Sequence, residues 1–286
     1  KKFKEMSSYA SWTMVGTLGF TVKEQISNII LNHFFGTLIN AARGVAGQVC
    51  SAINLFATNF FMAMSPQITK QYAGGNIEES KKLVYVGAKF TFFLLQILII
   101  PVIINLEYIL QLWLVDVPKY TTEFIIIILL STLIGSLSNS VTTALQATGK
   151  IKTFQIGVAL ILLTELPIAY ILLKIGYPPT YALLPALLTN FICVLFRFYL
   201  LQKMLPQYSL KFYISNIIFR CIFAFILSIA ICIYISHFFV PSFINLILTS
   251  AISILMSVFI IYLIGLEKKE RTIIKELFHQ KILHKC

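Results

Sequence analysis

Long apolar stretches recur along almost the whole chain, and short polar breaks separate them. A helix that crosses a hydrocarbon layer of ~30 Å needs about 20 mainly apolar residues. Eight stretches have this character, at residues 9–35, 40–64, 83–105, 122–145, 154–175, 181–201, 214–238 and 243–266. The pattern predicts an all-α, polytopic membrane protein with about eight transmembrane helices in one domain, residues 1–266.

Several of these stretches contain β-branched runs, such as Ile125 to Ile128, which favour strands in water. In lipid, an isolated strand leaves its backbone N–H and C=O groups unpaired, at a cost of several kcal/mol each. A membrane barrel needs short strands in which every second residue is polar and faces the lumen. The sequence does not alternate in this way, so we predict helices.

The composition indicates a lipid environment, since 58% of the residues are hydrophobic, 12% are charged and the mean hydropathy is +0.86. With a cytoplasmic N-terminus, only Lys119 and Lys174 fall in outer loops. Cytoplasmic loops carry the excess of Lys and Arg, so we predict that both chain ends are cytoplasmic and that residues 267–286 form a basic amphipathic tail. This topology and attraction to anionic lipid heads account for the net charge of +12, so no nucleic-acid partner is expected.

The sequence contains no pattern typical of a metal site or an enzyme. Its five cysteines and four histidines are scattered, without a CxxC pair or the spacing of metal ligands on one helix face. A glycine-rich phosphate loop, an HExxH motif and a nucleophile elbow are also absent. We therefore expect no catalytic residues, no metal and no cofactor.

The second stretch carries a row of polar and small residues on one helix face. Its members are Asn40, Arg43, Gly47, Ser51, Asn54, Thr58 and Ser65, and with Met62 in the same row they recur at steps of three or four. An arginine in the hydrocarbon region costs about 2.5 to 3.5 kcal/mol, so it normally faces a partner or a watery cavity. Two interpretations remain for Arg43: an anchor that reaches the outer membrane surface, or an anion-binding cation in a cavity. The second is favoured because the row continues inward.

The first stretch shows a similar row of Thr13, Thr17, Thr21, Glu24 and Asn28, with Lys23 beside it. Neighbouring residues on a helix point about 100° apart, which argues against a simple pair between Lys23 and Glu24 and predicts another partner for each. A hydrogen-bonded seam between helices explains the row equally well.

Further charged residues lie inside other stretches. Glu165 lies close to Pro167 and is either a proton or cation site or a carboxyl group buried against hydroxyl side chains. Lys89, Arg197 and Arg220 are predicted to extend toward the cytoplasmic interface as snorkelling anchors.

Four segments carry a family resemblance: NAARGVA at 40–46, SPQITK at 65–70, LWL at 112–114 with Pro118 and Tyr120, and ALQATGKIK at 144–152. They resemble the polysaccharide-export flippases, which move lipid-linked O-antigen or capsule repeat units. The lipid II flippases and the multidrug and toxin extrusion (MATE) antiporters belong to the same superfamily. Members usually have two pseudo-symmetric halves around a central cavity. The chain begins with Lys1, and we expect it to be the C-terminal part of such a bundle, without the first half.

The resemblance implies a flippase of the bacterial inner membrane that translocates undecaprenyl-diphosphate-linked oligosaccharide by alternating access. Arg43 matches a cavity arginine of relatives and is the candidate for binding the diphosphate, because a guanidinium grips phosphate oxygens in a fork. Lys23 is a second candidate cation. Glu24 and Glu165 are candidates for an ion or proton site. Hydrogen bonds to the sugars are assigned to Asn28, Ser51, Asn54 and Thr58.

The implied partners are the lipid-linked oligosaccharide, membrane lipids, and a polysaccharide polymerase with its chain-length machinery. Two alternatives stay open. An ion-coupled multidrug antiporter of the same superfamily would use the carboxylates Glu24 and Glu165 rather than Arg43. A membrane-embedded glycosyltransferase or polymerase is the more distant alternative.

Overall fold

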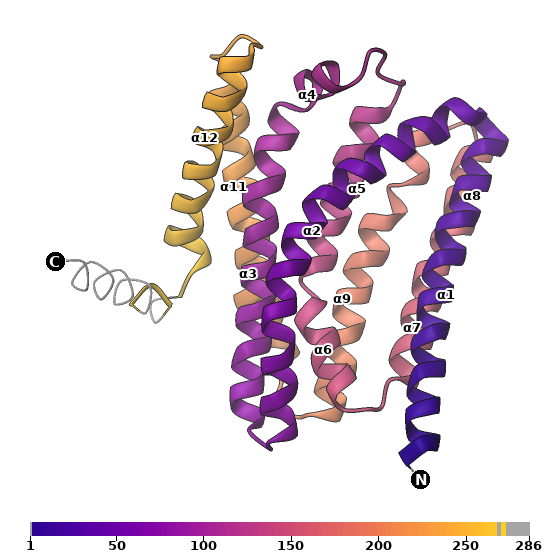
Figure 1. Ribbon diagram of the computed structural model, residues 1–286, viewed down its shortest axis with the longest axis vertical. Helices are drawn as coiled ribbons and strands as arrows, with labels where there is room; N and C mark the ends of the chain where they lie inside the picture. The colour runs from indigo at the N-terminus through magenta and orange to yellow at the C-terminus, as the bar shows by residue number, and fades with distance from the viewer. Residues whose placement is uncertain (1, 268–269, 273–286) are drawn as a thin grey trace.

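The computed structural model describes residues 2–267 and 270–272, and helices make up almost all of this part of the chain (Figure 1). The described residues include no strand, so the predicted all-α class is confirmed. The α-helices are α1 (Lys2–Phe35), α2 (Thr37–Ala73), α3 (Ile77–Ile104), α4 (Leu106–Trp113), α5 (Thr121–Ser136), α6 (Asn139–Ala147), α7 (Lys152–Leu163), α8 (Glu165–Lys174), α9 (Pro185–Met204), α10 (Leu210–Tyr213), α11 (Phe219–Ser236) and α12 (Phe243–Ile260). Three short helices complete them: η1 (Pro179–Ala182), η2 (Ile214–Ile218) and η3 (Ile261–Gly265).

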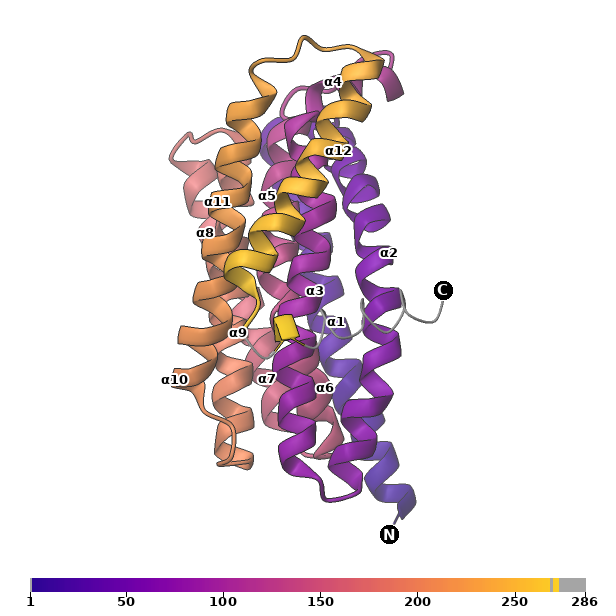
Figure 2. The same ribbon diagram turned by 90° about the vertical axis from the view of Figure 1, so that its left-hand side faces the viewer.

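The long helices form a bundle whose axes run roughly along the longest direction of the molecule (Figures 1 and 2). Helix α1 packs along α7 and α8, and α2 packs against α3, α5 and α6. Helix α9 contacts α5 and α7, while α11 and α12 cover the other side of α3. Helices α1 and α2 meet at one end of the bundle and diverge from there, because α2 crosses obliquely to reach α3 (Figure 1).

Six helical segments of the described chain are long and apolar enough to cross a membrane, and the bent pair of α5 and α6 would make a seventh. The expectation of about eight is therefore too high by this measure. The expected span without a counterpart is the first one, residues 9–35. It lies in α1, which is 34 residues long but is not among the apolar segments. Its polar residues, including Lys23 and Glu24, lower its hydropathy, and several of them line the cavity described below.

Two of the expected spans are broken in the middle. Helices α5 and α6 form an angle of 42° where Leu137 and Ser138 separate them. Helices α7 and α8 are separated at Thr164, three residues before Pro167. Because proline has no backbone N–H, it cannot donate to the carbonyl of Leu163 four residues earlier. This break makes Glu165 the first residue of α8.

Close approach of α1 to α7 depends on small residues. A Cβ added at Gly19 would lie 2.9 Å from the Cβ of Ala159 and 3.7 Å from its Cα. Ordinary contacts between carbon atoms lie at about 3.5–4.0 Å, so even a methyl group does not fit here without movement. Glycine at this position therefore allows α1 to lie against the part of the bundle that carries Glu165.

Two predicted anchors are wrong. Lys89 exposes only 2% of its surface, and its Nζ lies 2.5 Å from Oε1 of Glu270 and 3.9 Å from Oε1 of Glu267. Arg197 donates to the hydroxyl of Ser138 and lies 5.7 Å from the ring centre of Phe154. Both cations meet protein partners, so they do not need to reach the membrane surface.

Arg220 is half-buried, with Nη1 3.5 Å from Oε1 of Glu267. Most of the tail predicted at 267–286 lies outside the described residues, so its amphipathic helix stays a prediction.

Candidate functional site

A cavity of about 660 Å³ lies between α1, α2, α5, α8 and the segment from η1 to the start of α9. Apolar residues such as Phe20, Ile127 and Leu166 form part of its wall. Polar and charged side chains form the rest: Lys23, Glu24, Ser27, Asn28, Asn40, Arg43, Ser51, Asn54, Ser131, Thr132, Glu165 and Asn190.

The turn between α1 and α2 brings the two polar rows together. It consists of Gly36, whose φ of 79° lies in the left-handed region that glycine adopts at little cost. The chain reverses there, so the last turns of α1 lie beside the first turns of α2 (Figure 1). One cavity is consequently lined from both helices, by Lys23, Glu24, Ser27 and Asn28 of α1 and by Asn40, Arg43, Gly44 and Gly47 of α2.

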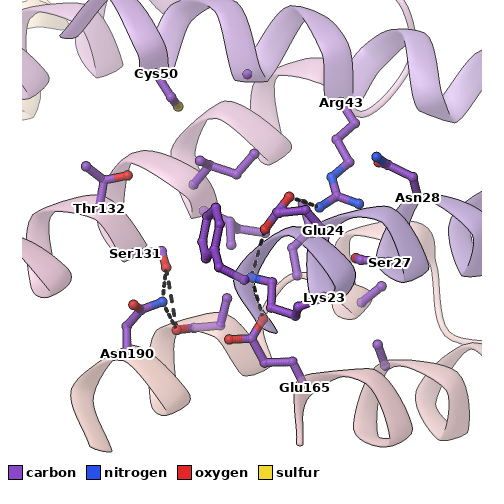
Figure 3. A pocket seen from close by; sticks show the side chains of 18 of the residues that line it. Lys23, Glu24, Ser27, Asn28, Arg43, Cys50, Ser131, Thr132, Glu165 and Asn190 are labelled. Carbon is purple, nitrogen blue, oxygen red and sulfur yellow. Dashed lines mark hydrogen bonds and ion pairs between the residues drawn. The ribbon is translucent and has the colours of Figure 1, made fainter. Parts of the chain in front are cut away.

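Four charged side chains form a continuous chain of ion pairs in this wall (Figure 3). Nη2 of Arg43 lies 2.7 Å from Oε2 of Glu24, and the other oxygen of Glu24 lies 2.8 Å from Nζ of Lys23. The same Nζ lies 3.0 Å from Oε2 of Glu165. Thr189 of α9 donates to the second oxygen of Glu165. The network thereby links α2, α1, α8 and α9.

The expectation that Lys23 and Glu24 do not pair is wrong. Their Cα–Cβ directions diverge, but both side chains are long and flexible enough to meet beyond the helix surface, at 2.8 Å. Each also has the second partner that the sequence predicted, Glu165 for Lys23 and Arg43 for Glu24.

Hydrogen-bonding capacity in the network is unequally used. Both oxygens of Glu24 and both oxygens of Glu165 have partners. By contrast, Nη1 of Arg43 and Oδ1 of Asn40 are buried atoms without a protein partner among the described residues. An unsatisfied buried polar group costs about 1–3 kcal/mol, and more when it is charged. The buried unused capacity of the cavity wall therefore lies on α2, at Arg43 and Asn40.

A family model, MatE, matches residues 13–171 of this chain, which covers most of α1, all of α2 to α7 and most of α8. The match extends over more than half of the chain and includes every cavity element except the segment from η1 to α9.

The chain belongs to the MatE family. Members of this family are transporters, so the MatE assignment and the apolar helices together identify a multi-pass membrane transport protein. No curated protein and no solved structure matches the chain.

Within this MatE chain, seven of the eight residues proposed from the sequence line the cavity. These are Lys23, Glu24, Asn28, Arg43, Ser51, Asn54 and Glu165. Thr58 does not line it and is exposed one turn further along α2. Beyond it, Ser65 lies 3.4 Å from the hydroxyl of Thr143 in α6, so the row on α2 ends as a contact between helices. The roles of these residues in binding stay predictions.

Sequence reasoning missed the contribution of α5 and α9. Asn190 donates to the hydroxyl of Ser131 at 2.8 Å and to the carbonyl of Ala186 at 2.8 Å, and both Ser131 and Asn190 line the cavity (Figure 3). The available signal was the pair Ser131 and Thr132, which interrupts a run of Ile and Leu.

The two cations and two carboxylates of the network cancel in charge when all four are ionised. The cavity is therefore polar without a net formal charge from these groups. An arriving ion meets groups that already neutralise each other, so it gains hydrogen bonds chiefly where they are unused.

Proposed function

We propose that this MatE transporter is a flippase for undecaprenyl-diphosphate-linked oligosaccharides in the bacterial inner membrane, and that Arg43 binds the diphosphate. The observation that carries the proposal is the unpartnered Nη1 of Arg43, a residue with 9% exposure in the cavity wall. A guanidinium binds phosphate oxygens through parallel N–H donors. Such a ligand would satisfy a group that the protein alone leaves without a partner.

The carboxylates of the cavity favour an anionic ligand over a cationic one. Each oxygen of Glu24 and Glu165 already accepts from Lys23, Arg43 or Thr189. A cationic drug would have to displace one of these donors, whereas a phosphate oxygen would bind at Nη1 of Arg43, which has no described protein partner.

Uncharged side chains near Arg43 suit a sugar. Asn28, Ser51 and Asn54 lie in the same wall and offer amide and hydroxyl groups. Sugars present hydroxyl groups that both donate and accept, so side chains of this kind hydrogen-bond to them without a charge. A polysaccharide polymerase with its chain-length machinery would take up the delivered repeat units.

Replacing Arg43 tests the proposal. In right-side-out vesicles, we measure the fraction of lipid-linked oligosaccharide that a membrane-impermeant oxidant reaches on the outer leaflet. Since a hydrogen bond to a charged group contributes about 1.5–3 kcal/mol, Arg43→Ala is expected to lower translocation by about 10- to 100-fold. Arg43→Lys should retain part of it.

Thr69→Ala serves as the control, because Thr69 is an exposed polar residue of the same helix outside the cavity wall. Thermal unfolding of each purified variant separates loss of transport from loss of folding. Wild-type translocation by a folded Arg43→Ala protein would refute the assignment.

An ion-coupled antiporter for cationic drugs is the second candidate, because two carboxylates lie in the same cavity. It predicts proton-driven efflux of a cationic dye that Glu165→Gln abolishes and Arg43→Ala leaves intact. Dye efflux with this pattern, together with normal glycan delivery by Arg43→Ala, would favour the antiporter over the flippase.

A further inference from the structure

A second hollow lies where α9 is connected to α10. Its volume is about 900 Å³, and its wall comes from the last turn of α9, the connecting segment, α10 and the start of η2. Figure 2 shows this connection at the lower end of the bundle, the end that also carries the turn between α2 and α3. None of its lining residues lines the central cavity.

The wall combines apolar surface with two lysines. Leu210 and Ile214 contribute aliphatic surface, and Tyr199 contributes an exposed aromatic ring. Lys203 and Lys211 lie in the same wall, and neither forms an ion pair with a described residue. No carboxylate lines the hollow. The wall of the hollow therefore presents positive charge beside apolar surface.

Its floor is held in place by hydrogen bonds and packed rings. Gln202 accepts from the backbone N–H of Leu210 at 2.9 Å, and the hydroxyl of Tyr85 accepts from that of Ser209 at 3.2 Å. Tyr208 is completely buried, and its ring centre lies 6.1 Å from that of Tyr85. A wall fixed in this way binds a ligand without first having to become ordered.

The hollow lies at the ends of two apolar segments, which is the depth at which a lipid head-group layer is expected. Its lining residues come from the end of the apolar segment Pro179–Met204, the beginning of the apolar segment Leu210–Ser236 and the short connection between them. Tyrosine and lysine are typical of this depth, where aromatic rings meet the interface and ammonium groups meet phosphates.

We infer that this hollow, which we call the α9–α10 groove, binds one anionic phospholipid, with its phosphate between Lys203 and Lys211 and an acyl chain along Leu210 and Ile214. The charges are complementary, since the groove carries two ammonium groups and no acid. The apolar wall distinguishes a lipid from a free phosphate ion, which would gain nothing from Leu210 or Ile214. Basic pockets between transmembrane helices are sites of this kind.

The test uses the purified full chain in nanodiscs that contain equal amounts of phosphatidylglycerol and phosphatidylcholine. After transfer to detergent, mass spectrometry measures how much of each lipid stays bound. The wild-type protein is expected to retain phosphatidylglycerol preferentially. The double variant Lys203→Gln, Lys211→Gln should bind it about 10- to 30-fold more weakly, as expected for two lysines near an anionic head group.

Two controls make the result specific. The variant Lys70→Gln, Lys150→Gln removes two exposed lysines at the same end of the bundle, outside the groove, and should retain the lipid as the wild type does. Ser215→Trp keeps both lysines but fills part of the groove, and it should also weaken retention.

Three outcomes would overturn the inference. The first is equal retention of both lipids by the wild type. The second is equal loss in the Lys70 and Lys150 control, which would indicate a general charge effect. The third is displacement of bound phosphatidylglycerol by millimolar inorganic phosphate, which would indicate a site for the phosphate group alone.

Discussion

Separating Lys23 from Glu165 is expected to destabilise the bundle much more than separating an ion pair at its surface. The two side chains each expose 9% of their surface and connect α1 to α8, with 3.0 Å between Nζ and Oε2. We consider Lys23→Met, Glu165→Gln and the double variant. Each substitution removes a charge and keeps a side chain of similar length.

The magnitude follows from the geometry. At 3.0 Å, two unit charges attract by about 5 kcal/mol at an effective dielectric constant of ~20. Desolvation offsets much of this attraction, but removing one partner of a buried pair typically costs about 3–5 kcal/mol because the other charge is stranded. Lys23 keeps Glu24 at 2.8 Å, so we expect Glu165→Gln to cost about 2–3 kcal/mol. Lys23→Met leaves Glu165 without a cation and should cost about 3–4 kcal/mol.

A double-mutant cycle isolates the pair, with unfolding followed by titration with sodium dodecyl sulfate in mixed micelles. We expect a coupling energy of about 2 kcal/mol between Lys23 and Glu165. The matched control is Lys81 and Glu78, 2.5 Å apart with side chains that are 23% and 63% exposed. Exposed pairs of this spacing contribute only about 0.3–0.5 kcal/mol. A Lys23 and Glu165 coupling no larger than that of the control would refute the reasoning.

Two further substitutions test contacts between helices. Gly19→Ala should lower the free energy of unfolding by about 1–3 kcal/mol, because the added Cβ would lie 2.9 Å from that of Ala159. Thermal unfolding should show partial rescue of this loss by Ala159→Gly. A Gly19→Ala protein as stable as the wild type would contradict the close packing. Glu270→Gln should destabilise the protein by about 2–4 kcal/mol because it leaves the buried Lys89 with Glu267 at 3.9 Å. The same assay on Lys89→Met, Glu270→Gln should show recovery of much of that loss, and a double variant less stable than Glu270→Gln would contradict this account.

Hydropathy predicted the membrane helices well because lipid imposes a length and an apolar character that one segment shows by itself. The polar rows on α1 and α2 were also visible, since a step of three or four residues places side chains on one face of a single helix. That the parts of both rows closest to Gly36 line the same cavity follows from the reversal at Gly36. A local pattern was sufficient for these features.

Features that join distant segments escaped the same reasoning. Lys89 was placed at the membrane surface because its distance from the helix end allowed it, whereas its partners Glu267 and Glu270 come after the last long helix. Asn190 and Ser131 meet in the cavity from α9 and α5, and no periodicity within one helix relates them. The pair Lys23 and Glu24 was misjudged because helix angles describe Cβ directions and not the reach of long side chains.

The charge network makes it possible to test folding and binding with different residues. Lys23 and Glu165 satisfy each other inside the bundle, so their loss weakens the protein whether or not a substrate is present. A transport defect in either variant is therefore evidence of contact with a ligand only when the variant is shown to be folded. Arg43 differs, because Nη1 has no described protein partner and Glu24, its other contact, keeps Lys23 when Arg43 is replaced. Loss of transport in a folded Arg43 variant would consequently point to binding of the substrate by Arg43. The proposed function therefore depends on Arg43 and not on the buried pair of Lys23 and Glu165.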